Sequence, residues 1–357
     1  MLPNLSFDNT RWDSMGLTFD DLYGGVLGYL RSAVREMGKP QSDVDPVKAH
    51  LDDFRAMCHQ VTYRMPGSHF EFEHFRERCM VETLGAHMIE AGLVPTTSPT
   101  TQHLAASFYL WMRNHHPLVA PKRELLQALQ NTTPPDDFSF GEISWPYPFW
   151  VVALPKGLVK DPYDMDVTYL ILRTTRAGSD FVGRDRLSEG AEQQLYGESG
   201  RPHDPPNMFG LTIITEGNAY YRSIQPGDGD AVSAFMQFPE VRETNLAEQD
   251  DQLICDMISL VFNLALYLMA HPEDQQESQL LRTTKGAKIP GKKKRLPGTR
   301  IYQPNILGRA YASQVDGHGT HGSPRTHWRR GHWRRVHHGT GRKLVKLSWI
   351  KATLVND

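Results

Sequence analysis

The sequence has little cysteine and lacks the common motifs of nucleotide-binding proteins and hydrolases. Its 357 residues include three cysteines, Cys58, Cys79 and Cys255, which are far apart and form no CxxC pair. This spacing excludes a disulfide framework and a thiolate zinc site of the usual type, and it is typical of the reducing cytoplasm. The patterns GxxxxGKS, GxxxxGKT, GxSxG and HExxH do not occur. No motif requires an enzyme, so we predict a cytoplasmic protein without catalytic residues, cofactor or metal.

Targeting and membrane signals are also scarce. The first residues, MLPNLSFDNTRWDSMG, contain no basic segment followed by an apolar one, so we expect no secretory signal peptide. One stretch, residues 253–270, is long and apolar enough to be considered as a membrane span. In a membrane, Asp256, Ser259 and Asn263 would lie in hydrocarbon, where the aspartate alone costs about 3 kcal/mol. We predict that this stretch is instead a buried helix of a soluble core, with no membrane partner.

The small net charge of −2 results from two oppositely charged parts of the chain. Residues 282–357 contain 18 lysines and arginines and two aspartates, a net charge of +16. The other 281 residues contain 21 basic and 39 acidic residues, a net charge of −18. This separation favours a nucleic-acid or other acidic partner for the basic part. The alternative is that the basic part folds back on the acidic body and needs no partner.

In the first 130 residues, apolar side chains recur every three or four positions, which predicts helices. Gly38 and Gly92 would end the first and third of these helices, and Pro66 follows the second. We expect an all-helical lobe over residues 1–130. Its helices are predicted over residues 18–37, 46–65, 70–91, 101–115 and 122–129.

After the proline-rich break at residues 131–135, the period of the apolar pattern changes from that of helices to that of strands. The predicted fold class is α+β: a helical lobe, then a mostly antiparallel sheet with a buried helix, then a C-terminal β module. The sheet and the helix over residues 247–270 would form a body over residues 131–274, with a surface insertion at 177–206. A flexible basic linker over residues 275–300 would lead to the module at 301–357. Strands are predicted at residues 149–154, 167–174, 208–215, 219–224 and 231–238, with a hairpin turn at 216–218.

The end of the chain, residues 323–355, interleaves cationic and aromatic side chains before a Gly-Thr-Gly turn at 339–341 and a strand pattern, RKLVKLSWI. Guanidinium groups bind phosphate or carboxylate oxygens, and indole faces stack on bases, peptides or guanidiniums. The segment therefore favours an anionic or aromatic partner. The alternative is that these groups stack on one another at a solvated sheet edge. The candidate residues that would face nucleic acid or the ribosome are His327, Trp328, Arg329, Arg330, His332, Trp333, Arg334 and Arg335.

Two further hypotheses come from the histidines near the C-terminus. His318 and His321 have a spacing that zinc sites use, but the shell would need to be almost entirely imidazole because no cysteine is near. A metal-free ribonuclease could use His327 or His332 as a general acid or base beside Arg329 or Arg330. That chemistry requires two imidazoles on opposite sides of one phosphate, which the spacing does not establish.

The run HWRRGHW, followed by GTG and a tryptophan-bearing strand, resembles the C-terminal signature of the type V-A anti-CRISPR family that causes decay of its target nuclease's mRNA. The family pattern is proline-histidine-x-arginine-arginine-glycine-histidine-tryptophan. Here Thr326 replaces the proline, and Trp328 occupies the variable position. Weaker similarity occurs at residues 146–154, 260–274 and 300–311, and none in the first 130. The matching positions are His327, Arg329, Arg330, Gly331, His332 and Trp333.

The resemblance implies a protein of a phage or plasmid that recognises the N-terminal segment of a nascent target polypeptide, after which the translated mRNA is degraded. The implied partners are that nascent polypeptide and the mRNA or ribosome. Such a protein needs a groove or strand edge for an extended peptide and a basic surface for RNA. A rival hypothesis is a plasmid or phage accessory protein that binds nucleic acid without acting on translation. The candidate peptide-binding residues are Trp145, Tyr147, Phe149 and Trp150.

Overall fold

The structure is a computed structural model whose described residues fall into two compact units. Unit 1 comprises Met1–Pro117, Gly217–Tyr221 and Ser278–Pro304, and unit 2 comprises Leu118–Glu216, Arg222–Glu277 and Asn305–Asp357. The structure describes residues 19–65, 72–90, 104, 107–108, 111–112, 118–135, 138–175, 208–224, 248–276, 278–286, 298–309, 327–329, 331–350 and 353–355.

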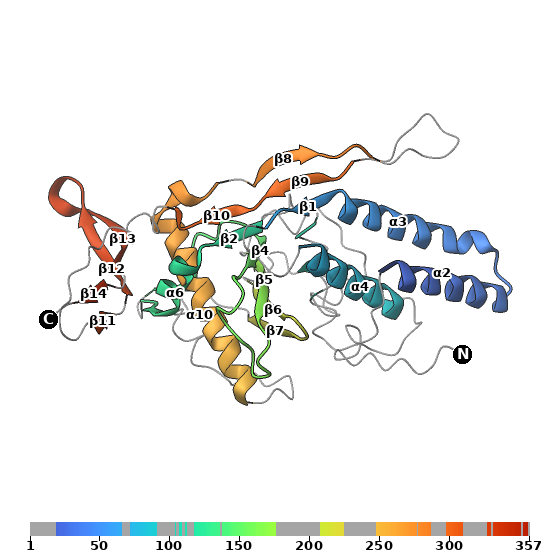
Figure 1. The fold of residues 1–357 in the computed structure, drawn as a ribbon, viewed down its shortest axis with the longest axis horizontal. Helices are drawn as coiled ribbons and strands as arrows, with labels where there is room; N and C mark the ends of the chain where they lie inside the picture. The colour runs from blue at the N-terminus through green and yellow to red at the C-terminus, as the bar shows by residue number, and fades with distance from the viewer. Residues whose placement is uncertain are drawn as a thin grey trace. The chain divides into compact units, whose positions relative to one another are not determined.

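Unit 1 contains three helices that are labelled in Figure 1, and the apolar residues predicted for them are largely buried. They are α2 (Phe19–Glu36), α3 (Asp45–His59) and α4 (Phe72–Glu90). Helix α2 ends as expected at Gly38, whose φ of 67° lets its N–H bond the carbonyl of Arg35. An aromatic cluster that includes Phe72, Phe75 and Trp111 fills the core of the unit. The helix predicted over residues 101–115 falls largely outside the described residues.

A three-stranded sheet with the order β1-β9-β8 completes unit 1. Strand β1 (Val61–Tyr63) pairs in parallel with β9 (Arg300–Gln303), which pairs antiparallel with β8 (Gln279–Thr283). The prediction of a flexible linker over residues 275–300 is therefore wrong for Gln279–Thr283. The residues around this strand are polar and basic, but its own backbone groups pair with β9, a strand that begins at Arg300.

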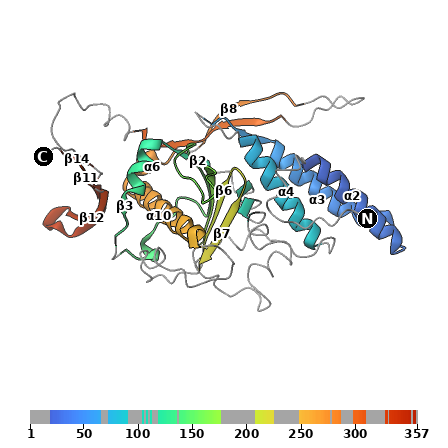
Figure 2. The same ribbon diagram turned by 60° about the horizontal axis from the view of Figure 1, so that its bottom comes forward.

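The largest sheet has six strands in the order β10-β2-β4-β5-β6-β7 (Figures 1 and 2). Five of these strands lie in unit 2, and β7 is divided, because its residues up to Tyr221 belong to unit 1. The sheet is mixed, because β10, β2 and β4 are parallel while β4, β5 and β6 are antiparallel. The bounds are β2 Leu118–Pro121, β4 Phe149–Ala153, β5 Val167–Thr175, β6 Met208–Thr215, β7 Ala219–Ile224 and β10 Asn305–Leu307.

Helix α10 (Glu248–Ala270) is the apolar core helix of unit 2. It lies across the sheet, where Phe262 stacks on Phe209 of β6 with ring centroids 5.2 Å apart. Helix α6 (Arg123–Gln130) packs against α10, so it belongs with the sheet and not with the N-terminal helices as we predicted. By length and composition the segment Asp251–Ala270 could cross a membrane, but most of it is buried within the protein.

The mixture of helices and sheets confirms the predicted α+β class. The predicted strands over residues 149–154, 167–174, 208–215 and 219–224 correspond within a residue to β4 to β7. The predicted strand at 231–238 and the insertion at 177–206 lie outside the described residues. The predicted C-terminal module is not separate, because β9 belongs to unit 1 and β10 extends the sheet of unit 2.

Candidate functional site

The cationic end of the chain forms a β-hairpin in unit 2. Strand β12 (Gly331–His338) pairs antiparallel with β13 (Leu344–Ile350), in a register from His332 opposite Ile350 to His338 opposite Leu344. The connecting turn includes Gly339 with φ 78° and Gly341 with φ 70°, which a residue with a Cβ adopts only with strain. The base of the hairpin pairs in parallel with β3 (Thr132–Thr133).

One side of the hairpin, its inner face, is anchored by two tryptophans. Trp333 and Trp349 lie opposite each other, stack with centroids 6.0 Å apart and are buried. The Trp333 Nε1–H donates to Asn263 Oδ1 at 2.8 Å, and the Trp349 Nε1–H donates to Thr132 Oγ1 at 3.3 Å. Both indole N–H groups are therefore satisfied inside the protein. The base of the hairpin is a structural joint.

Asn263 is the polar centre of this joint, and sequence reasoning noted it only as an obstacle to a membrane span. It is fully buried in α10, and its Nδ2 donates to the carbonyls of Leu129 at 3.1 Å and Thr132 at 2.7 Å. Leu129 lies in the last turn of α6, where carbonyls lack helical partners. One side chain thus links α10, the end of α6 and the hairpin. The sequence signal for this role is a polar asparagine within an otherwise apolar helix, which needs hydrogen-bond partners when it is buried.

Arg335 also lies on the inner face and is bound to the protein itself. Its guanidinium Nη2 is 3.0 Å from Glu142 Oε1, and its Cζ lies 5.7 Å from the ring centroid of Phe138. The pKa of Glu142 is held below its usual value, first by the backbone N–H of Ser139 and then by Arg335, while burial acts in the opposite direction. This arginine is not a free cation for a ligand.

The Glu142 interactions predict a small acid sensitivity of unit 2. Because the pKa of Glu142 is lower in the folded than in the unfolded state, its stabilisation is present above the unfolded value of 4.5. It is lost as the pH falls through the folded value. We expect the melting temperature difference between the wild type and Glu142→Gln to shrink when scans are repeated at decreasing pH. Arg335→Ala should retain most of this pH dependence, because the Ser139 N–H contributes more; a pH-independent difference would contradict the assignment.

The other side of the hairpin, its outer face, carries the unpaired cations. Alternation along the strands places Arg334 and Lys346 on this face, opposite Ser348 and Val336 respectively. Arg342 and Lys343 extend the charge into the turn, and all four cations are exposed. Within the described parts of the chain, none of the four takes part in an ion pair. The hairpin itself, residues 331–350, contains no acidic residue.

The AcrVA2-like family model, described as the anti-CRISPR type V subtype A2 family, matches residues 119–357. The chain belongs to this family. The match begins at the second residue of unit 2 and leaves out the helices α2, α3 and α4. No curated protein and no solved structure matches the chain.

The structure of this AcrVA2-like protein separates the residues that the sequence grouped together as facing nucleic acid. Arg334 and His332 lie on the exposed outer face, whereas Trp333 is buried and Arg335 is paired with Glu142. The prediction for Trp333 needs correction, because alternation along β12 turns its indole toward α10. His327–Arg329 form β11, which pairs antiparallel with β14 (Thr353–Val355). Arg330 and the side chains of Trp328 and the rest of β11 lie outside the described residues.

The aromatic residues predicted to bind peptide are also divided. Phe149 and Trp150 are buried in β4, a strand with neighbours on both edges, so neither offers a surface to a peptide. Trp145 and Tyr147 are half-buried in the segment that leads into β4. Trp145 packs on Phe262 with ring centroids 5.6 Å apart. This cluster therefore belongs mainly to the core of the AcrVA2-like unit 2.

The histidines do not converge in the described part of the chain. His337 and His338 are consecutive in β12 and project to opposite faces, so these two cannot flank one phosphate. The use of His327 or His332 stays a prediction, because the side chain of His327 lies outside the described residues. His318 and His321 fall outside the described residues. Among the residues that the structure describes, no group of three His, Cys, Asp or Glu side chains is arranged to hold a metal ion.

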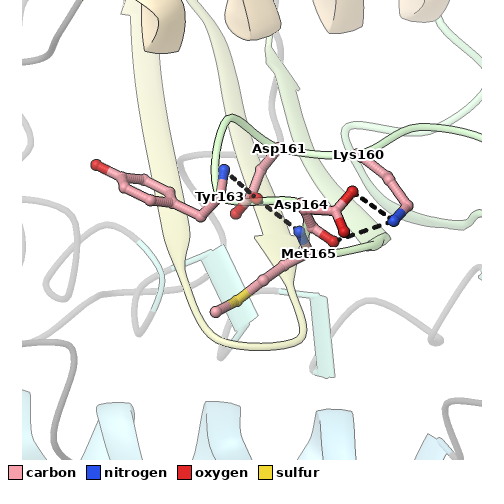
Figure 3. A network of polar contacts seen from close by, with 5 residues as sticks. All are labelled: Lys160, Asp161, Tyr163, Asp164 and Met165. Carbon is pink, nitrogen blue, oxygen red and sulfur yellow. Dashed lines mark hydrogen bonds and ion pairs between the residues drawn. The ribbon is translucent and has the colours of Figure 1, made fainter.

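The acidic turn between β4 and β5 is occupied by its own hydrogen bonds (Figure 3). Asp161 Oδ1 accepts the backbone N–H groups of Tyr163 and Met165, each at 2.9 Å. Asp164 pairs with Lys160 and adopts a φ of 65°. These carboxylates shape the turn.

Proposed function

We propose that this AcrVA2-like protein is an anti-CRISPR silencer that binds the N-terminal segment of a nascent target polypeptide and promotes degradation of the mRNA being translated. Membership of the family supports the anti-CRISPR part of this proposal. The observation that carries the RNA-facing part is the hairpin, whose tryptophans are used for anchoring while Arg334, Arg342, Lys343 and Lys346 remain exposed. In this proposal the protein acts in the cytoplasm and host ribonucleases cleave the RNA.

A strand edge in unit 1 supports the peptide-binding part. Strand β8 is the last strand of its sheet, so among the described residues one row of its backbone N–H and C=O groups has no neighbouring strand. All five of its residues are exposed, including Leu280 and Leu281 at 48% and 41%. Natural proteins usually protect such edges, because they are templates for another strand. An extended nascent peptide could add to β8, with backbone hydrogen bonds for affinity and the leucines contacting its side chains.

This function can be tested by measuring the level of the target nuclease mRNA in the presence of a variant whose β8 edge carries added charges. We expect Leu280→Lys combined with Leu281→Lys to restore the target nuclease mRNA to the level found without the inhibitor, because lysines on an edge disfavour strand addition. The same variant should lose capture of the nuclease's N-terminal fragment by the purified protein. Met37→Lys is the matched control, since Met37 is an exposed apolar residue elsewhere in unit 1.

Two results would contradict the proposal. One is full silencing and full peptide capture by the β8 variant. The other is cleavage of bare RNA by the purified wild-type protein that is lost in His332→Ala, which would make the protein a nuclease.

A further inference from the structure

The outer face of the hairpin carries exposed cations and imidazoles, but no indole, phenol or phenyl ring. We infer that this face binds the phosphate backbone of double-stranded RNA, as found in structured ribosomal RNA, and not the bases of a single strand. The inference rests on the proposed function and specifies the ligand of its RNA-facing surface. The residues that would make the contacts are Arg334, Arg342, Lys343 and Lys346. His332 precedes Arg334 at the base of the hairpin, and His338 lies between Lys346 and the turn.

The first argument is the position of the indoles. Single-strand binding surfaces combine cations with aromatic side chains on which successive bases stack, each stack being worth about 1–3 kcal/mol. In the described hairpin both tryptophans are buried on the inner face and hydrogen-bonded to Asn263 and Thr132. The outer face retains two imidazoles but no indole, phenol or phenyl ring. It is therefore poor in stacking surface and rich in charge.

The second argument is the arrangement of the charges. Arg334 lies across from Ser348, and Lys346 lies two residues from Ser348 along β13, so the two cations are separated by about 7 Å along the ribbon. Arg342 and Lys343 add two exposed cations at the turn end of the hairpin. A row of exposed cations on a narrow ribbon suits a regular line of phosphates, whose neutralisation releases counterions.

The third argument concerns the shape and the apolar residues of the face. The deep major groove of A-form RNA is too narrow for a ribbon, but its minor groove is wide, shallow and lined with 2′-hydroxyls. On the outer face, Leu344 and Ile350 are exposed at 58% and 39% beside His338 and His332. Imidazoles can bond 2′-hydroxyls and phosphate oxygens, and the aliphatic side chains can contact ribose. The face thus fits a shallow, polyanionic surface.

The experiment measures the affinity of the full-length protein for a labelled 16-base-pair RNA duplex, for each strand alone and for the DNA duplex of the same sequence. We expect the RNA duplex to bind at least about tenfold more tightly than either strand. Arg334→Ala with Lys346→Ala should weaken duplex binding about tenfold and reduce the slope of log K against log salt by about 2, one for each lost phosphate contact. Arg334→Lys with Lys346→Arg should bind like the wild type.

Arg335→Ala is the matched control, because this arginine is adjacent in sequence but is held on the inner face by Glu142. It should change duplex affinity by less than about threefold. Far-UV circular dichroism checks that the exposed substitutions leave the fold intact. The inference is overturned if a single strand or the DNA duplex binds as tightly as the RNA duplex, or if the double alanine variant keeps the wild-type salt slope.

The outcomes also separate this inference from the proposed function. If the double alanine variant loses duplex binding but still silences the target, the ligand assignment stands and the role of the hairpin in silencing fails. If the wild-type protein does not prefer the duplex while the β8 variant abolishes silencing, the ligand assignment fails and the silencing function stands.

Discussion

Trp333→Ala is expected to lower the free energy of unfolding of unit 2 by about 3–5 kcal/mol, the usual cost of deleting a buried aromatic side chain. The substitution removes a ring that stacks on Trp349, and it leaves the Oδ1 of Asn263 buried without its donor. Both losses occur where the hairpin joins α10. Differential scanning calorimetry and denaturant titration of the full-length protein measure the effect.

His332→Ala is the control for this substitution. His332 precedes Trp333 in β12 but lies on the outer face, and it is exposed. Its removal should change the free energy of unfolding by no more than about 0.5 kcal/mol. Equal effects of the two substitutions would mean that the hairpin is not anchored by its inner face.

The second large effect is expected for Asn263→Leu. Leucine has the same number and branching of side-chain heavy atoms, so the change leaves no cavity, but it removes the acceptor of the Trp333 N–H and the donor to the carbonyls of Leu129 and Thr132. An unsatisfied buried group costs about 1–3 kcal/mol, and we expect a total loss of about 3–5 kcal/mol. Because Leu129 ends α6, the loss should include fraying of that helix, which hydrogen exchange of α6 would detect.

A double-mutant cycle separates the indole bond from the two carbonyl bonds. Trp333→Phe removes the N–H but keeps an aromatic ring. If the Trp333–Asn263 hydrogen bond is formed as observed, the double variant with Asn263→Leu should be more stable than the sum of the single effects by about 0.5–3 kcal/mol. Strict additivity would show that the two side chains do not interact.

Much of the local structure was predictable because it depends on neighbours in the chain. The periodic apolar side chains of α2 and α10 and the alternation in β5 and β6 each indicated an element close to its observed bounds. The EGN turn at 216–218 likewise falls between β6 and β7. These patterns report which face of an element is buried, so they do not require knowledge of what buries it.

Long-range pairing was not predictable in the same way. Strand β1 is three residues long and pairs with β9, which begins at Arg300. Strand β8 is held in the same sheet by its pairing with β9. The polar composition around β8 indicated a linker, because no apolar period marks a strand exposed on both faces. The boundary between the units at residues 117 and 118 was also missed. Strand β2, with which unit 2 begins, is short, and its partners β4 and β10 are distant in sequence.

The candidate site shows most clearly which features the sequence determined and which only the tertiary structure decided. The sequence alone determined that the last 76 residues are strongly basic and that a cationic, tryptophan-containing strand and a glycine turn occur near the C-terminus. The resemblance of that segment also pointed to the anti-CRISPR family to which the chain belongs. Only the tertiary structure decided that Trp333 and Arg335 face inward while Arg334 faces outward. The reason is that alternation assigns residues to two faces, but Asn263 of α10 and Glu142, far away in sequence, determine which face is buried.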